Sequence, residues 1–366
     1  MSELKFKIAI SLLPGIGCIL ARRLVSYCGS IESVFLEKKN NLKKIPGIGE
    51  FLASRISNQQ VLDIAEREVE FIHKNNIQPI FYLDAGFPFR LKQCEDGPVM
   101  LYAKGNVNFD HPRIISVVGT RKATPYGKLI CEQVIADLSK KNHDPIIVSG
   151  LAYGIDIQAH REALKNKLQT IAVLGHGFNH IYPPAHRGTA REITHRGAVV
   201  TEFTSDTKPD RQNFIKRNRL IAGLADATLV IESAEKGGAL ITADIAHSYN
   251  REVLAVPGRS NDRYSAGCNK LIKTNKAALI ESAEDIEKIL NWDLGKKSLP
   301  VQKELFHNFS EEEELIIAII RESGEVSMDD IAANSGLPVQ KVSSLLFNLD
   351  MDGIIQCMPG KIYRVA

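Results

Sequence analysis

Six short apolar runs, rich in valine and isoleucine, recur along the middle of the chain. They occupy residues 114–119, 146–150, 170–175, 197–203, 227–233 and 252–258. The runs largely lack the alternation of half-exposed strands, so they predict strands that are buried on both faces. Helical stretches separate them, an order typical of βαβ units in a doubly wound, mostly parallel sheet. We therefore predict an α/β domain over residues 80–292, with ligands at the carboxyl ends of its strands.

The first 79 residues, which we predict to form a helical domain, contain a local repeat. "LLPGIGCILARRLV" (12–25) and "KKIPGIGEFLASRI" (43–56) share Pro-Gly-Ile-Gly followed by a helical pattern. Glycine permits a tight turn between two helices, and the N–H groups of the turn then lie at a helix start. This resembles the helix-hairpin-helix module, which contacts DNA phosphates without reading bases. The alternative is a hairpin used only for packing, since the second copy has only Lys43 and Lys44 as nearby cations.

The carboxyl-terminal part is predicted to be a winged helix joined by a linker. Residues 293–309 are polar and contain a proline, as a linker does. Ser310 can cap a helix that opens with four glutamates, which the positive end of the helix dipole favours. Two further helices, over about 328–335 and 338–351, and a closing hairpin complete the winged-helix pattern of residues 310–366.

Charge is unevenly distributed along the chain. The whole sequence of 366 residues has a formal net charge of only +3, which identifies no partner by itself. Residues 305–366, however, carry ten acidic and four basic side chains, so the excess of cations lies in the first two regions.

Cysteine usage and hydropathy lead us to expect a cytoplasmic protein. The six cysteines form no C-x-x-C pair and lie mostly in apolar stretches, as reduced cysteines do. The amino terminus lacks the apolar core and cleavage site of a signal peptide. No apolar run approaches ~18 residues, so we expect no membrane span.

The first strand ends in a stretch suited to an anion. In "VVGTRKATPYG" (117–127), Gly119 would let a ligand approach the backbone, and Thr120, Arg121 and Lys122 open the turn into a helix. The planar guanidinium of Arg121 matches a phosphate. The loops after the next two strands also place small residues at the strand ends, where a ligand can approach the backbone. These residues are Ser149, Gly150, Gly154, Gly175 and Gly177. Three such loops on one edge of a sheet predict an anion site, although each glycine could simply serve a tight turn.

A second group of cations follows the fourth strand. Arg211, Lys216, Arg217 and Arg219 surround Phe214 and Asn218. Such a cluster at a helix start suits several successive phosphates. A solvated helix face with ion pairs is the alternative. Gly237, Gly238 and Thr242 lie near the end of the fifth strand and join the candidate site.

Catalytic groups are not evident. The chain has no G-x-S-x-G elbow, no H-E-x-x-H, no P-loop and no Cys/His cluster with metal-ligand spacing. Gly175-x-Gly177 is half of a dinucleotide fingerprint. We interpret His176, His180 and His186 as solvated or hydrogen-bonded loop residues, and Asp156 and Glu202 as carboxylates that brace loops. We predict no catalytic residue, metal or cofactor.

Taken in order, the motifs resemble those of the DNA processing protein A family (DprA, also called Smf). They are "LYAKG" (101–105), "VVGTR" (117–121), "SGLAYGID" (149–156), "GHGFNHIYP" (175–183), "TEF" (201–203), "RNRLIAGL" (217–224), "GGALITA" (237–243), "VLAVPG" (253–258) and "GCNKLI" (267–272). The resemblance implies a helical amino-terminal domain, an extended Rossmann-like domain and a winged-helix tail. It also implies a non-enzymatic protein that binds single-stranded DNA, dimerises through the Rossmann-like domain and loads RecA recombinase onto DNA during natural transformation. Arg121 matches the family arginine that contacts DNA phosphates.

The chain departs from the family pattern at several points. Gly237-Gly238-Ala239-Leu240 stands where Ser-Gly-Ser-Leu is usual, which removes two hydroxyl donors. Phe214-Ile215-Lys216 replaces a Phe-Pro sequence. Pro184 replaces a cation, so Arg187 is expected to take that part, and Lys276-Ala277 replaces Gly-Ala.

Two other functions remain open from the sequence. One is an enzyme that acts on nucleotides, since related Rossmann-like folds include phosphoribohydrolases, although "EKGGALITA" lacks their glutamate. The other is a regulator that binds duplex DNA through its winged helix, which the acidic tail disfavours.

Overall fold

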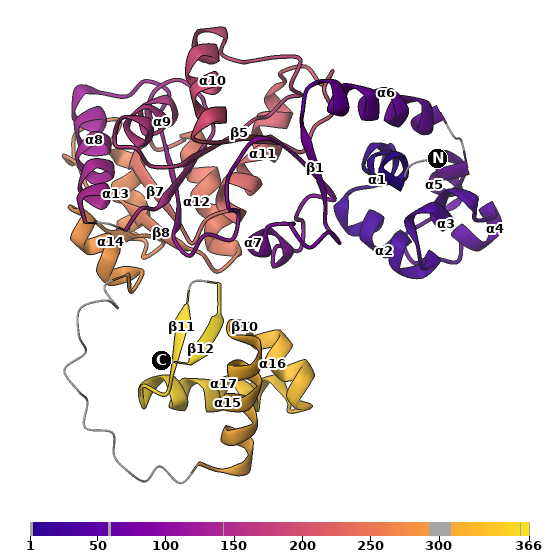
Figure 1. Ribbon diagram of the computed structural model, residues 1–366. Helices are drawn as coiled ribbons and strands as arrows, with labels where there is room; N and C mark the ends of the chain where they lie inside the picture. Colours follow the sequence, from indigo (N-terminus) through magenta and orange to yellow (C-terminus); the bar gives the residue numbers. More distant parts are fainter. Residues whose placement is uncertain (1–2, 58–59, 142, 293–308, 359, 366) are drawn as a thin grey trace.

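A single large sheet organises the middle of the chain (Figure 1). The computed structural model describes residues 3–57, 60–141, 143–292, 309–358 and 360–365. In these residues the sheet has nine strands in the order β1-β2-β6-β5-β4-β3-β7-β8-β9. The strands are β1 (Gln78–Phe81), β2 (Met100–Gly105), β3 (Ile114–Gly119), β4 (Ile146–Ser149), β5 (Thr170–Val173), β6 (Gly197–Thr201), β7 (Ala227–Glu232), β8 (Glu252–Ala255) and β9 (Ala278–Leu279).

The doubly wound parallel sheet is confirmed. All six predicted runs are strands, from β3 to β8 in chain order. From β3 the chain adds β4, β5 and β6 on one side and β7, β8 and β9 on the other, with every neighbouring pair parallel. The direction of winding therefore reverses between β3 and β7. β1 and β2, which the sequence did not predict, extend the β6 side as antiparallel strands.

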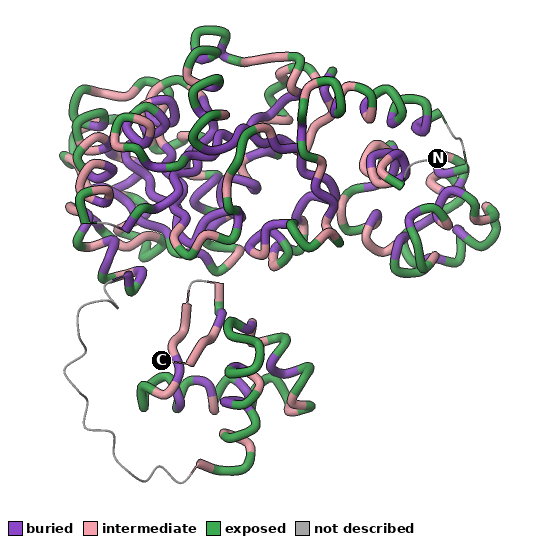
Figure 2. Tube along the Cα trace, viewed as in Figure 1, coloured by how far each residue is buried: buried purple, intermediate pink, exposed green. Residues whose placement is uncertain are grey.

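Helices cover both faces of this sheet, so its central strands are buried, whereas the edge strands β1 and β9 are partly exposed (Figure 2). On β3, Ile114 and Val118 join the core under one set of helices, and Ile115 and Val117 join the core under the other. The helices are α7 (Phe89–Lys92), α8 (Pro125–Lys140), α9 (Ile155–Lys165), α10 (Arg187–His195), α11 (Arg211–Gly223), α12 (Gly238–Ser248), α13 (Ala266–Lys273) and α14 (Ala283–Ile289), with a short 3-10 helix at Pro184–His186. None of the described helices has both the length and the apolar character needed to cross a membrane.

The amino-terminal region is helical, as predicted. Its helices are α1 (Glu3–Leu12), α2 (Cys18–Cys28), α3 (Ile31–Leu36), α4 (Lys39–Leu42), α5 (Glu50–Ser57) and α6 (Gln60–Lys74). They share one hydrophobic core with Phe81, Val99, Met100 and Tyr102 of the β1–β2 unit. The buried carboxylate of Glu68 also accepts the N–H of Ser205 at 2.9 Å, so this core is tied to the loop after β6.

The two Pro-Gly-Ile-Gly turns pack against each other's helices. Gly15 and Gly47 both have positive φ, at +80° and +87°, which favours glycine. A Cβ on Gly15 would lie 3.1 Å from Leu52 of α5, and one on Gly47 would lie 2.9 Å from Leu20 of α2. Equivalent residues of the two copies are 32 positions apart, so each turn fits the helix of the other copy.

The winged-helix tail is confirmed. It comprises α15 (Glu311–Ser323), α16 (Met328–Ser335), α17 (Val339–Met351) and a small sheet of β10 (Val326–Ser327), β12 (Ile362–Val365) and β11 (Ile355–Met358). Ser310 caps α15 and Glu313 completes a capping box. The predicted linker lies outside the described residues except for Phe309.

Candidate nucleic-acid interface

The loop after β3 is fastened to the end of β7, at the point where the winding of the sheet reverses. The N–H of Thr120 donates to the carbonyl of Glu232 at 2.7 Å. Thr124 caps α8, and its hydroxyl donates to the Glu232 carboxylate at 2.6 Å. Ligands of doubly wound sheets bind at such a switch point, so these loops frame the candidate site.

Glu232 occupies the place where a nucleotide phosphate would be expected. Its carboxylate is almost fully buried and accepts the N–H of Thr124 at 3.0 Å, at the start of α8. A Cβ on Gly127, in the first turn of α8, would lie 2.5 Å from Glu232 Oε2. The helix start that binds pyrophosphate in dinucleotide folds is thus filled by a carboxylate of the chain itself, which would repel a phosphate.

Arg121 and Lys122 stand free beside this closed helix start. Both side chains are exposed. Within the described ranges, neither forms a hydrogen bond or an ion pair through its side chain. Exposed cations without acidic partners are suited to an external anion, because no intramolecular ion pair has to break when it binds.

Gly154 holds the loops after β3 and β4 together. It has φ +81° and ψ −124°, a region open essentially to glycine. A Cβ at this position would lie 2.1 Å from the carbonyl oxygen of Thr120 and 2.8 Å from the Cα of Arg121. The next N–H, of Ile155, donates to the same carbonyl at 3.2 Å. The position of Arg121 therefore depends on the absence of a side chain at residue 154.

Replacement of Gly154 by alanine should lower the free energy of unfolding by about 2 kcal/mol, because it adds backbone strain to a steric clash. Chemical denaturation followed by circular dichroism measures this change. Gly188→Ala is the matched control, since Gly188 lies in the first turn of α10 and a Cβ there meets nothing within 4 Å. Equal stability of the two variants would contradict the assignment.

A buried pair of opposite charges supports the loop after β4. Arg217 of α11 is 4% exposed and donates to the carbonyl of Gly150 at 2.7 Å and also to that of Val173. Asp156 is buried close by and accepts the N–H groups of Gly150 and Ala152. Burial raises the pKa of the Asp156 carboxyl and lowers the pKa of Arg217 to about 10. Arg217 therefore stays charged at neutral pH and supports the loop from within.

Aromatic rings surround this charged group. Tyr153 and Tyr182 are 49% and 45% exposed, and Phe214 lies 5.6 Å from Tyr182 between ring centroids. With Arg121 and Arg217 they line a cavity of about 30 Å³, large enough for about one water molecule. A nucleobase does not fit inside it, so the exposed faces of the tyrosines are the surfaces available for stacking.

The remaining predicted residues divide into an outer and an inner set. Lys122, Arg187, Lys216 and Gly238 are exposed, and Gly119, Thr120, Asn218 and Gly237 are half-buried. Ser149, Gly150, Gly175, Gly177, Arg217, Arg219 and Thr242 are buried.

The inner set shapes the edge of the sheet from within. Ser149 donates to the carbonyl of Val117 at 2.6 Å. Gly175 leaves room for Phe214, whose ring would lie 2.7 Å from a Cβ at that glycine. Arg219 pairs with Glu202, which Lys216 also approaches at 3.4 Å. Arg217 and Arg219 therefore stabilise the loops from within in this conformation, whereas Lys216, which is close to them in the sequence, is exposed.

Two of the three candidate histidines are hydrogen-bonded to backbone. The Nδ1 atom of His176 lies 3.0 Å from the carbonyl of Gly177, and that of His186 lies 2.7 Å from the carbonyl of Leu151. Both rings brace loops, which agrees with their interpretation as hydrogen-bonded loop residues.

Sequence reasoning did not single out Tyr153, Tyr182 or Glu232. The two tyrosines lie in the loops that follow β4 and β5, so their signal was an aromatic residue at the carboxyl end of a buried strand. Glu232 is the last residue of β7, where nothing in the sequence shows which helix it faces.

The doubly wound sheet has the Glu232 carboxylate at the start of α8, and Arg121 and Lys122 are exposed close to it. This arrangement defines a Rossmann-like protein. Family models agree and are more specific. Residues 78–291 match the model of the DNA recombination-mediator protein A, and residues 308–361 match that of the DprA winged helix domain. The chain belongs to the DNA recombination-mediator protein A family, DprA/Smf.

Individual relatives extend the likeness over nearly the whole chain. The putative DNA processing protein DprA of Mycobacterium tuberculosis is 31% identical over 359 residues, covering 94% of this chain and 90% of the relative. The structure of DNA processing protein A from Streptococcus pneumoniae superposes with a TM-score of 0.69 and 29% identity, over 79% of this chain and 98% of that one. The Helicobacter pylori protein, described in terms of its single-stranded DNA binding mode, gives a TM-score of 0.53 and 28% identity, over 59% and 96%.

Proposed function

We propose that this protein binds single-stranded DNA along the carboxyl-terminal edge of its parallel sheet. The observation that carries the proposal is the pair Arg121 and Lys122, exposed and outside any ion pair among the described residues, next to the exposed rings of Tyr153 and Tyr182. Single-strand binding proteins combine cations for the backbone with aromatic faces for the bases. The single-stranded DNA named for the Helicobacter pylori relative supports the same ligand here.

The strand is held chiefly through its phosphates, with Arg121 and Lys122 as the primary contacts. Arg187 and Lys216, both exposed, extend the basic surface. Backbone groups come from the end of β3, at Gly119 and Thr120, and from the start of α12, at Gly237 and Gly238. Phosphate contacts carry no sequence information, so binding is expected to tolerate any sequence.

Delivery of the bound strand to RecA recombinase, during natural transformation and recombination, is the proposed role of the complex. Membership of the recombination-mediator family supports this role. We also propose a homodimer formed through the Rossmann-like domain, for which light scattering should give twice the chain mass of 40.5 kDa.

A binding measurement with two ligands at two salt concentrations tests the proposal. Fluorescence anisotropy should show tighter binding of a labelled single strand than of a duplex of the same length. The affinity should fall as salt rises, because each phosphate contact releases counterions. Equal affinity for both forms would favour the duplex-binding alternative.

The nucleotide-processing enzyme remains the alternative function. The Glu232 carboxylate at the start of α8 argues against a phosphate there. We expect nucleoside monophosphates and a labelled single strand to stay intact on prolonged incubation, as followed by liquid chromatography. Turnover that disappears in Glu202→Gln or Asp156→Asn, with the fold retained, would establish the enzyme instead.

Removal of the winged helix, by truncation after residue 295, should leave most single-strand affinity in place. The tail is acidic, and Lys341 of α17 is already paired with Glu312. The outer side of α17 instead exposes Phe347 and Met351, at 65% and 72%, which suits a protein partner better than phosphates. Dissociation constants of both forms in one buffer provide the test. A loss of more than about tenfold, with fold and dimer intact, would show that the tail contacts DNA.

A further inference from the structure

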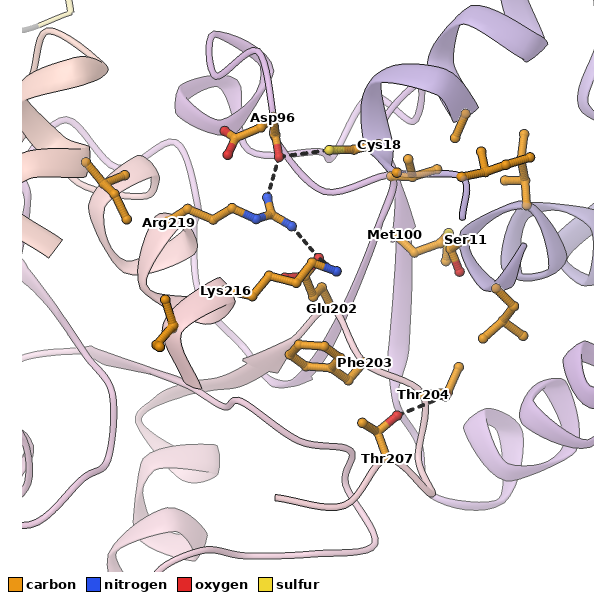
Figure 3. Close-up of a pocket in the computed structure, with 18 residues that line it drawn as sticks. Ser11, Cys18, Asp96, Met100, Glu202, Phe203, Thr204, Thr207, Lys216 and Arg219 are labelled. Carbon is orange, nitrogen blue, oxygen red and sulfur yellow. Dashed lines mark hydrogen bonds and ion pairs between the residues drawn. The ribbon is translucent and has the colours of Figure 1, made fainter. Parts of the chain in front are cut away.

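A cavity of about 510 Å³ lies between the amino-terminal helices and the sheet (Figure 3). One wall comes from the end of α1 and the first Pro-Gly-Ile-Gly turn, including Leu12 and Ile16. The opposite wall comes from the loop after β6 and from α11, including Phe203 and Ile215. Ligand pockets in proteins have volumes of roughly 300–1,000 Å³, so this cavity has the size of a ligand site.

The polar groups on the cavity wall are largely bonded to one another. Arg219 donates to Glu202 and to the carbonyl of Asp96, and the Cys18 thiol lies 3.2 Å from that carbonyl oxygen. The hydroxyls of Thr204 and Thr207 pair at 3.2 Å (Figure 3). Apolar side chains make up most of the remaining wall. The cavity therefore suits an apolar or aromatic body, and among the described residues Glu202 Oε1 is left as a buried acceptor without a hydrogen-bond partner.

Lys216 provides a positive charge at this site. Its side chain is 56% exposed, and its Nζ lies 5.3 Å from the centre of the Phe203 ring. The 3.4 Å contact with Glu202 is at the long end of ion-pair distances, since Arg219 already holds that carboxylate. A ligand that combines a flat apolar body with a negative group would match Phe203 and Lys216 together.

Helix α11 joins the cavity to the proposed DNA edge. Phe214 and Arg217 line the small cavity beside Arg121, while Ile215 and Lys216 line the large one. Successive helical residues point about 100° apart, and the helix with its side chains is only about 10–12 Å wide. A strand held at Arg121 that crosses the first turns of α11 therefore reaches both sites.

We propose that the large cavity takes up one unstacked base of the bound single strand, with an adjacent phosphate on Lys216. The proposal rests on the proposed function and adds to it a specific base site made jointly by the amino-terminal helices and the sheet. Apolar contact with Phe203 and the aliphatic wall holds the base, and every base has the flat face that this requires. The cavity should therefore accept any of the four bases, which agrees with a DNA edge that binds phosphates without reading the sequence.

An abasic scan of the DNA tests the base site with the full chain. Twelve oligothymidylate 12-mers, each with one abasic position, are compared with the intact strand by fluorescence anisotropy. The wild-type protein should lose about tenfold in affinity at one or two adjacent positions and little elsewhere, as loss of one aromatic–base contact predicts. In Ile215→Glu, which puts a charge on the cavity wall at a residue outside the buried cores, this penalty should vanish.

The matched control is Gln212→Glu, an exposed position on the same helix that does not line the cavity. It adds the same negative charge as Ile215→Glu. The loss of affinity caused by the abasic position, relative to the intact strand, should therefore persist even if the affinity for both strands falls. A flat scan with the wild-type protein, or an unchanged penalty in Ile215→Glu, would overturn the base site. If the intact strand itself fails to bind, the proposed function is wrong, and the two failures are thus distinguished.

Discussion

Replacement of Arg217 by methionine should lower the free energy of unfolding by about 3 kcal/mol at neutral pH. The guanidinium is buried against the carbonyls of Gly150 and Val173, and methionine leaves both without their donor. It also removes the cation with the larger effect on the buried carboxyl of Asp156 and leaves only the weaker effect of Arg121. Removal of one member of a buried charged pair commonly costs about 3–5 kcal/mol. Urea denaturation measures the change.

The pH dependence of this variant identifies the cause. Burial already raises the pKa of Asp156 in the folded protein, and loss of Arg217 should raise it further. A carboxyl with a raised pKa in the folded state gains stability as pH falls through that pKa. The difference in free energy of unfolding between wild type and Arg217→Met should therefore be smaller at pH 5 than at pH 8. Arg161→Met, at an exposed position on α9, is the control and should stay within about 0.5 kcal/mol of wild type. A similar small change in Arg217→Met would mean that the buried pair contributes little.

Charge reversal at Arg121 should weaken single-strand binding by about a hundredfold at moderate salt. Substitution by alanine removes one phosphate contact and flattens the salt dependence by about one unit of slope. Glutamate adds repulsion on top of that loss, so the slope should fall by about two units. In the described parts of the chain Arg121 forms no side-chain hydrogen bond or ion pair, and its charge acts on the buried Asp156 at a longer range than an ion pair, so the folded state should keep most of its stability. Anisotropy titrations at several salt concentrations give both quantities.

Arg161→Glu separates a local contact from a general change in net charge. It alters the charge by the same amount on an exposed part of α9. Its affinity should fall much less than that of Arg121→Glu. Equal losses in the two variants would show that DNA responds to the overall charge of the protein and that Arg121 makes no specific contact.

The central sheet could be predicted because each of its buried strands is a continuous apolar run. Two of the three strands that were missed lack that signal for physical reasons. β9 is two residues long, and β1 contains Pro79 at the edge of the sheet, where a missing N–H is tolerated. β2 has an apolar run, but it pairs antiparallel with both neighbours. No crossover helix of a βαβ unit therefore precedes it to mark it as a strand of the sheet. These strands depend on tertiary pairing more than on local pattern.

The candidate site was predicted less completely than the fold. The exposed cations at the end of β3 follow directly from a strand that ends in glycine. In α11, however, Lys216, Arg217 and Arg219 look alike in the sequence, and only the first is exposed. Their burial depends on Asp156 and Glu202, which come from other parts of the chain. Local sequence carries no information about such distant partners.

The reciprocal fit of the two Pro-Gly-Ile-Gly turns has a consequence for how the amino-terminal region folds. Since the Gly15 turn lies against Leu52 and the Gly47 turn lies against Leu20, neither 14-residue copy (12–25 or 43–56) has a complete packing surface for its own turn. Each copy therefore needs the other in order to pack its own turn. The two copies should unfold in a single cooperative transition. Neither copy should form a stable fold as an isolated fragment.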